Sequence, residues 1–294
     1  ESWTNKFLEA SDKHLRRFET ADSSESIRAF VESFSLVLPE LIAREKYELS
    51  MQVARIIKKR TESDDLFKQI LRSERDEIFT DELLEQLEKA VHKARKQDRV
   101  ALLGLLDFYR DKVVEFLVRV LVEAKDAALR RETCDALVKT GRRGVPALCA
   151  ALNNHGYDWF VARNLLMVLG VIGDVAAAPD VQRFLTHPNI RCREEAVVAV
   201  ARVRGRAAEP YLIERLSDSS RAVRRRTLQT LGSSGSVHMR YLTELEKLLD
   251  DPGSSVDEDS SPLDLQLAVL HSLEALGGEQ KLPSGKRVLT LLQE

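Results

Sequence analysis

The chain has 294 residues, of which 44% are hydrophobic, 6% are aromatic and 31% are charged, and its formal net charge is −2 at pH 7. This composition excludes intrinsic disorder, which combines low hydrophobicity with a large net charge, and the near-neutral charge gives no general attraction for a polyanion. The sequence has no run of about 18 apolar residues, so it predicts no membrane span.

The first 95 residues have helical periodicity but no regular repeat. The apolar spacing runs from Ser33 to Leu38 and again from Leu49 to Ile57, as expected for helices with one buried face. We expect residues 1–95 to form an irregular helical region or a cap for the array that follows, since terminal repeats must cover the stack. A separate helical bundle is the alternative. The chain begins with neither a signal peptide nor an initiator methionine, so we expect it to be a fragment of a longer protein.

From residue 96 onward one pattern recurs. Equivalent apolar anchors, spaced 32, 31 and 31 residues apart, are Leu137, Leu169, Val200 and Leu231. A fixed period of this length is typical of stacked helical hairpins. We therefore predict an all-α fold: an α-α superhelix, or solenoid, of antiparallel helix pairs over residues 96–294.

Glycines and prolines divide each repeat into two helices. The predicted breaks after the first helices contain glycines that permit a positive φ; they are Gly141, Gly144, Gly170, Gly173, Gly205, Gly232 and Gly235. Proline begins the second helix in three units, at Pro146, Pro179 and Pro210, because the first helical N–H needs no partner. A last unit follows at Leu276, 45 residues after Leu231. The excess length is an acidic, turn-rich insertion at 250–262, which we expect to be a mobile loop.

This order of residues resembles the HEAT repeat in the short form found in bacterial HEAT-like proteins. The shared pattern is an apolar residue and arginine, a small residue, Leu-Gly, a turn, and a proline-led second helix. It departs from that pattern at Ala162, where the arginine is missing. The resemblance implies a right-handed superhelix with first helices on the convex side and second helices on the concave side.

The arginines of the repeats fall into two groups. Arg130, Arg193 and Arg224 recur with the period, so we expect them to bridge neighbouring units. Of the others, Arg142 and Arg143 fall at places matching Arg204 and Arg206 in the turn between paired helices, and Arg204, Arg206, Arg225 and Arg226 depart from a strict copy. Arginine favours paired binding to carboxylate or phosphate groups. Together with one aromatic residue they are our candidate partner-binding residues: Arg142, Arg143, Trp159, Arg204, Arg206, Arg221, Arg225 and Arg226.

The aromatic candidate belongs to a cluster of Tyr157, Trp159 and Phe160. Aromatic anchors dominate binding hot spots. The alternative, which we favour, is that Trp159 or Phe160 packs between adjacent repeats, since large aromatic side chains are usually mostly buried.

Catalytic and metal-binding patterns are missing from the sequence. The three cysteines are scattered, so we interpret them as reduced core residues of a cytoplasmic protein. The histidines are isolated, and no metal or nucleotide motif is present. Deoxyhypusine hydroxylase, a HEAT-like enzyme, binds iron with repeated His-Glu dipeptides, and this chain contains none. We expect no catalytic residue, no metal and no cofactor.

Our hypothesis is a non-catalytic scaffold or adaptor that binds another protein or an acidic peptide through its concave face or an arginine-rich edge. One alternative is nucleic-acid binding, similar to HEAT-like alkylpurine DNA glycosylases. The acidic residues after Leu231 weigh against it, because they would repel a duplex. A bilin lyase-like enzyme is a further alternative that rests on the repeat alone. The sequence identifies neither the partner nor the oligomeric state.

Overall fold

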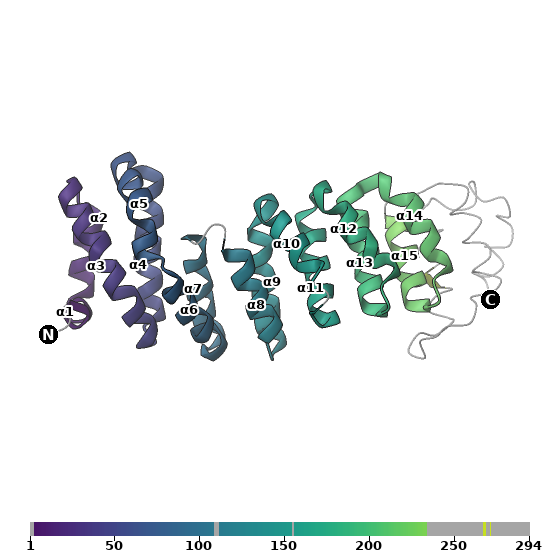
Figure 1. Cartoon of the computed structure of the whole chain (residues 1–294), viewed down its shortest axis with the longest axis horizontal. Helices are drawn as coiled ribbons and strands as arrows, with labels where there is room; N and C mark the ends of the chain where they lie inside the picture. Colours follow the sequence, from purple (N-terminus) through teal and green to yellow (C-terminus); the bar gives the residue numbers. More distant parts are fainter. Residues whose placement is uncertain (1–2, 109–111, 155, 234–266, 269–270, 272–294) are drawn as a thin grey trace. The chain divides into compact units, whose positions relative to one another are not determined.

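The structure, a computed structural model, describes residues 3–108, 112–154, 156–233, 267–268 and 271. Within these ranges the regular structure consists of α-helices joined by short 3₁₀ turns (Figure 1). No helix in the described ranges combines the length and apolar character needed to cross a bilayer. The chain divides into two compact units, residues 1–137 and 138–294.

Unit 1 is built from helices of very different length. They are α1 Trp3–Glu9, α2 Ser11–Thr20, α3 Ser24–Ala43, α4 Tyr47–Ser63, α5 Asp65–Ile78, α6 Asp81–Lys93, α7 Lys96–Gly104, the 3₁₀ turn η1 Leu105–Phe108, α8 Val113–Glu123 and most of α9 Ala127–Lys139. Phe18 and Phe34 meet edge to face with ring centroids 4.5 Å apart. The buried Arg60 donates to the Phe18 carbonyl (2.7 Å) and the Ala21 carbonyl (2.6 Å) and pairs with the Asp64 carboxylate, so its charge is balanced by backbone oxygens and one acid.

The 31-residue spacing extends upstream of residue 96. Helices α6 and α8 are joined by polar pairs whose members are 31 residues apart: Asp81 with Lys112, Glu88 with Arg119, and His92 with Glu123. The Arg119 Nη2 and Glu88 Oε2 atoms are 3.0 Å apart. The two helices therefore occupy equivalent positions in consecutive repeats. The predicted domain boundary between residues 95 and 96 lies inside unit 1 and stays a prediction.

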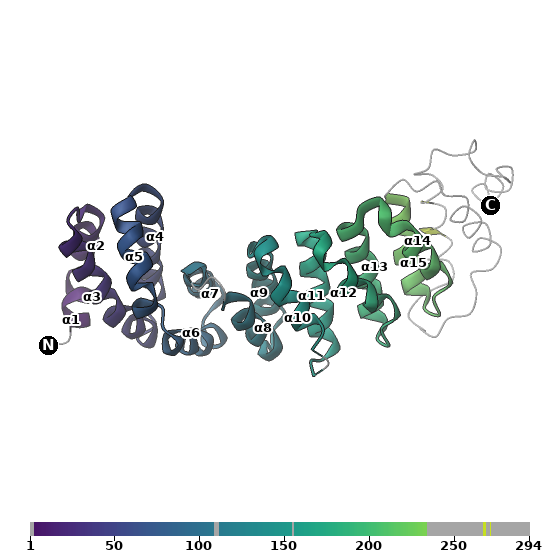
Figure 2. The ribbon, with the colours of Figure 1, turned by 45° about the horizontal axis from the view of Figure 1, so that its top comes forward.

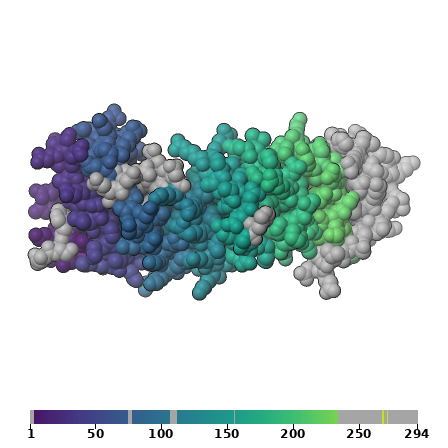
Figure 3. Space-filling model, viewed as in Figure 1, coloured from purple at the N-terminus to yellow at the C-terminus, as the bar shows by residue number. Residues whose placement is uncertain are grey.

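Unit 2 has two layers of helices (Figures 1 and 2). The first helices are α11 Trp159–Ile172, α13 Ile190–Arg204 and α15 Arg221–Ser233; the second helices are α10 Val145–Leu152, α12 Ala178–Arg183 and α14 Glu209–Ile213. The 3₁₀ turns are η2 Gly141–Gly144, η3 Val175–Ala177, η4 Phe184–Thr186, η5 Gly205–Ala208 and η6 Glu214–Ser217. Helix α13 packs between α11 and α15, and on the face drawn in Figure 3 the described residues of this unit form a continuous surface.

Local sequence signals are borne out at the turns. Gly141, Gly173 and Gly205 have φ values of 58°, 67° and 56°, a backbone region that favours glycine. A proline lies in the first turn of α10, α12 and α14. The predicted all-α fold of stacked helix pairs is therefore confirmed in the described ranges.

Gly170 corrects one prediction. It lies inside α11 and does not end the helix. A Cβ at this position would be 3.0 Å from the Cα of Ala199 on α13, so glycine here allows two first helices to approach closely. Gly232 likewise lies within α15. The insertion at 250–262, the second helix of the fourth repeat and, apart from residues 267–268 and 271, the last repeat are outside the described residues.

Candidate partner-binding surface

The arginines that recur with the repeat are held inside the array. The Nη1 atom of Arg193 donates to the His187 carbonyl (2.9 Å) and the Pro188 carbonyl (3.2 Å). Arg224 Nη1 donates to the Asp218 carbonyl at 2.6 Å. Each guanidinium thus donates to a carbonyl five or six residues earlier in the chain. This contact links the first turn of its helix to the preceding turn.

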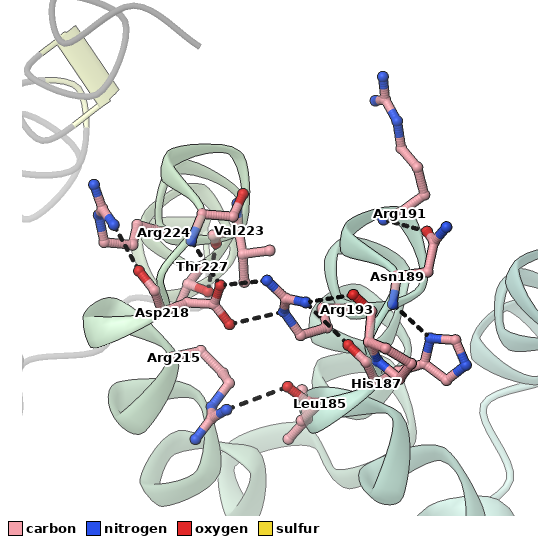
Figure 4. A network of polar contacts seen from close by, with 12 residues as sticks. Leu185, His187, Asn189, Arg191, Arg193, Arg215, Asp218, Val223, Arg224 and Thr227 are labelled. Carbon is pink, nitrogen blue, oxygen red and sulfur yellow. Dashed lines mark hydrogen bonds and ion pairs between the residues drawn. The ribbon is translucent and has the colours of Figure 1, made fainter. Parts of the chain in front are cut away.

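The same contact occurs in unit 1. Arg130 Nη1 donates to the Ala124 carbonyl (2.9 Å) and the Lys125 carbonyl (3.2 Å). Arg193 and Arg99 also reach the next repeat: Arg193 binds the carboxylate of Asp218 with two nitrogens (Figure 4), and Arg99 binds Asp126. These distances support the interpretation that period-matched arginines join neighbouring repeats.

Three candidate arginines project from the turns that link first and second helices. Arg142 and Arg143 are exposed in η2, and Arg206 is exposed in η5. The glycines that precede these turns are 32 residues apart, so Arg142, Asp174 and Arg206 occupy equivalent positions in three successive repeats. Arg142 Nε lies 3.5 Å from the Asp174 carboxylate. Along successive repeats, these turns therefore carry a positive, a negative and a positive side chain, namely Arg142, Asp174 and Arg206.

Arg204 differs from these three. Its Nη2 donates to Gln182 Oε1 at 2.7 Å, and its guanidinium carbon lies 4.7 Å from the centroid of the Tyr211 ring. Arg204 is half-buried and connects α13 to α12 and α14. Its predicted role in partner binding stays a prediction, and these contacts give it a structural role.

Trp159 begins α11 and is 46% exposed. Its carbonyl accepts a hydrogen bond from the Cys192 thiol, with the sulfur 3.3 Å from the oxygen. Phe160 beside it is half-buried. The favoured expectation, that Trp159 or Phe160 packs between adjacent repeats, is wrong for Trp159, because nearly half of this residue is exposed, and stays a prediction for Phe160.

The remaining candidates lie on α15. Arg226 is exposed, whereas Arg221 and Arg225 are half-buried. Arg221 begins α15 at the position that Trp159 occupies in α11, 62 residues earlier. First helices of 13 to 15 residues are about 20 Å long. Trp159 and Arg221 are therefore at the opposite end of the first helices from Arg142, Arg143 and Arg206, and the eight candidates do not form one cluster.

The described residues offer no assembled metal or thiol chemistry. Burial raises the pKa of the Cys149 thiol to about 12, with Asp180 nearby adding to the rise, and burial raises that of Cys192 to about 11. Cys134 is also buried, and none of the three forms a disulfide. No group of three potential metal ligands comes together in the described ranges.

One surface feature was missed by reasoning from the sequence. Met167, Val171 and Val175 follow Trp159 along α11 and its turn, and Val171 and Val175 are exposed. The signal was present in the composition of α11, whose 14 residues include only two with polar side chains, Arg163 and Asn164.

Stacked antiparallel helix pairs are the architecture of α-solenoids, and in this chain arginines recur at matching positions of the pairs. The sequence profile of HEAT repeats matches residues 114–199 and 181–261, which together span half of the chain. The chain belongs to the HEAT-repeat family.

Similar solved structures include an engineered protein, with 16% identity, a TM-score of 0.39, and coverage of 97% of this chain and 78% of that one. Another is the complex of CpcE and CpcF of phycocyanin lyase from Nostoc sp. PCC7120, with 20% identity, a TM-score of 0.32, and coverage of 76% and 94%. A search of curated proteins finds no match. At these scores neither structure supports a function.

Proposed function

We propose that this HEAT-repeat protein is a non-catalytic scaffold that binds an acidic segment of another protein. The binding surface is the arginine edge, which we define as Arg142, Arg143 and Arg206. The observation that carries the proposal is the contrast between these exposed side chains and Arg193 and Arg224, whose guanidinium groups are engaged inside the array. Exposed loops on a rigid scaffold are common binding sites.

The chemistry of the edge favours a protein segment over a nucleic acid. Asp174 lies between Arg142 and Arg206 in the repeat order and pairs with Arg142. A phosphate backbone carries negative charge at every step, so it would meet this carboxylate. A peptide with spaced acidic residues places its charges against the arginines alone and forms bidentate guanidinium–carboxylate pairs.

The test is quantitative affinity capture with the full chain as bait. The bait variant Arg142→Glu/Arg143→Glu/Arg206→Glu is compared with wild type and with a control of equal charge change, Lys13→Glu/Arg16→Glu/Arg17→Glu, at exposed sites of α2. Wild type and control should capture the same partner protein, and the edge variant should lose it. The released partner should have an unchanged mass, since a scaffold performs no chemistry.

Three results would contradict the proposal. Equal capture of the partner by the edge variant and by wild type would show that the arginine edge does not take part in binding. Loss of the captured material after nuclease treatment would show that a nucleic acid was bound. A reproducible mass change in the partner would show catalysis.

A further inference from the structure

Helix α11 carries apolar residues on its exposed face, where the next first helix, α13, carries arginines. A helix that is hydrophobic all round is normally buried, yet Trp159 is 46% exposed and Val171 is 51% exposed. Val175, in the turn that follows, is 68% exposed. Together with the half-buried Phe160 and Met167, these residues form a surface that we call the α11 stripe.

The stripe is particular to this repeat. Between residues 138 and 233, as far as the structure describes them, the large hydrophobic side chains that are exposed all belong to α11 or to the turn after it. At the equivalent positions 31 residues later, Arg191 replaces Phe160 and Arg202 replaces Val171. Stacking of repeats does not require apolar residues at Phe160 and Val171, because the next repeat stacks in the same way with arginine at both positions.

Helix α13 borders the stripe along its length. At one end the Cys192 thiol donates to the Trp159 carbonyl. In the middle, Arg163 Nη2 lies 3.6 Å from Glu195 Oε2. At the other end, a Cβ at Gly170 would be 3.7 Å from Cδ of Arg202. Arg163 of α11 and Arg202 of α13 therefore lie along the contact between the two helices, beside the stripe.

The exposed charge at this border is positive. Arg191 has 64% of its side chain exposed, whereas its partner Glu194 has 11%. Arg163 is likewise more exposed than its partner Glu195, and Arg202 is exposed. The arginine side chains are exposed to solvent, whereas their glutamate partners are mostly covered. A bound partner would therefore contact the cations before the carboxylates.

We propose that the α11 stripe docks an acidic amphipathic helix of a partner protein. Apolar residues of that helix, repeated at i, i+3, i+4 and i+7, would cover the stripe, and its carboxylates would pair with Arg163, Arg191 and Arg202. The proposal rests on the proposed scaffold function and adds a second surface to it. The stripe ends at η3, the turn that lies between η2 and η5 in the repeat order, so it adjoins the arginine edge.

Two other occupants fit the surface less well. A second copy of the chain, docked stripe to stripe, would bring like charges together at Arg191 and Arg202. Single-stranded nucleic acid binds by stacking successive bases on aromatic rings. The stripe has such rings only at its start, Trp159 and Phe160, and Met167, Val171 and Val175 continue it with aliphatic surface.

Trp159 supplies a reporter for the test. The chain has two tryptophans, so Trp3→Phe leaves Trp159 as the single emitter. The probe is a synthetic 18-residue helix of leucine and glutamate, with leucine at i, i+3, i+4 and i+7. It should shift the Trp159 emission to the blue and shield it from acrylamide, with half-saturation in the micromolar range. A peptide with lysine in place of glutamate should bind at least tenfold more weakly, and a scrambled leucine–glutamate peptide should not bind.

Variants locate the site. Val171→Glu and Arg191→Glu/Arg202→Glu should each weaken binding of the acidic probe at least tenfold, whereas Val100→Glu, at an exposed apolar position of unit 1, should not. Because these positions are exposed, unchanged circular dichroism and melting should accompany the loss.

Four outcomes would overturn the docking proposal: no response to the acidic probe, equal binding by Val171→Glu, a dimer that Val171→Glu dissociates, or tighter shielding of Trp159 by a single-stranded oligonucleotide. The arginine edge is tested separately by capture. If the probe does not bind the α11 stripe but capture of a partner still depends on the arginine edge, the docking inference is overturned and the proposed function stands.

Discussion

Arg193 and Asp218 form a two-pronged ion pair between consecutive repeats. Nε of Arg193 lies 3.0 Å from Oδ2 and Nη2 lies 2.9 Å from Oδ1, and both residues are buried. The same aspartate accepts a hydrogen bond from the Ser220 N–H, and its carbonyl accepts one from Arg224. Asp218 therefore connects α13, its own turn and α15 (Figure 4).

Asp218→Ala should lower the free energy of unfolding by about 3–5 kcal/mol, the usual cost of leaving a buried charge without its partner. Urea unfolding followed by circular dichroism measures this. The control Arg206→Ala, at an exposed turn position, should stay within about 0.5 kcal/mol of wild type. Equal midpoints for Asp218→Ala and wild type would mean that the pair does not hold the repeats.

Gly170→Ala should destabilise the protein although alanine is the better helix former. The helix propensity gain is about 1 kcal/mol. Against it, the new Cβ would press on the backbone of Ala199 at 3.0 Å, and overpacking costs about 1–3 kcal/mol. Thermal unfolding of the variant should therefore occur at a lower temperature.

Gly104→Ala in α7 is the matched control. The Cβ there would meet the flexible end of the Met51 side chain, which can move. This substitution should cost less than Gly170→Ala. The reverse order would show that α11 and α13 can separate freely.

The thiols of Cys149 and Cys192 should react slowly in the folded protein. Burial raises their pKa values to about 12 and 11, and the thiolate is the reactive form. Ellman's reagent at pH 8 should label them only slowly, and all three cysteines should react at once in guanidinium chloride. Because the folded pKa values are raised, neutral thiols add stability below the unfolded pKa near 8.5. That contribution should be lost as the pH rises toward 11 to 12. Rapid labelling of two thiols in the native protein would contradict this.

Acid should weaken unit 1 through Asp126. The Leu129 N–H donates to this carboxylate at 2.7 Å and Arg99 pairs with it, and these contacts lower the pKa of Asp126. A lowered folded pKa stabilises the protein above the unfolded value near 3.9. The contribution is lost as the pH falls through the folded pKa. Asp126→Asn should therefore lose less stability than wild type between pH 5 and pH 2, as measured by urea midpoints. If the urea midpoints of Asp126→Asn and wild type fall equally between pH 5 and pH 2, the Asp126 carboxylate does not cause the loss of stability in acid.

Much of the candidate surface could be identified from residue type and spacing, but its arrangement could not. The exposure of Arg142, Arg143 and Arg206 follows from turns that their neighbouring glycines encode locally. Arg204 stands in the same stretch of sequence, yet it is half-buried because Gln182 and Tyr211 lie beside it. Those partners belong to other helices, so the local sequence around Arg204 does not predict them.

The sequence by itself determined the repeat spacing, the turns and the helix starts, because glycine at positive φ and proline in a first helical turn are preferences of single residues. Only the tertiary structure decided which residues meet or stay uncovered. Gly170 is a helix contact because Ala199 packs against it, and Asp218 is the partner of Arg193 because two repeats stack. Trp159 and Val171 remain exposed because the stack covers only the other faces of α11. These outcomes depend on contacts between residues about 30 positions apart, which arise only when the helices pack.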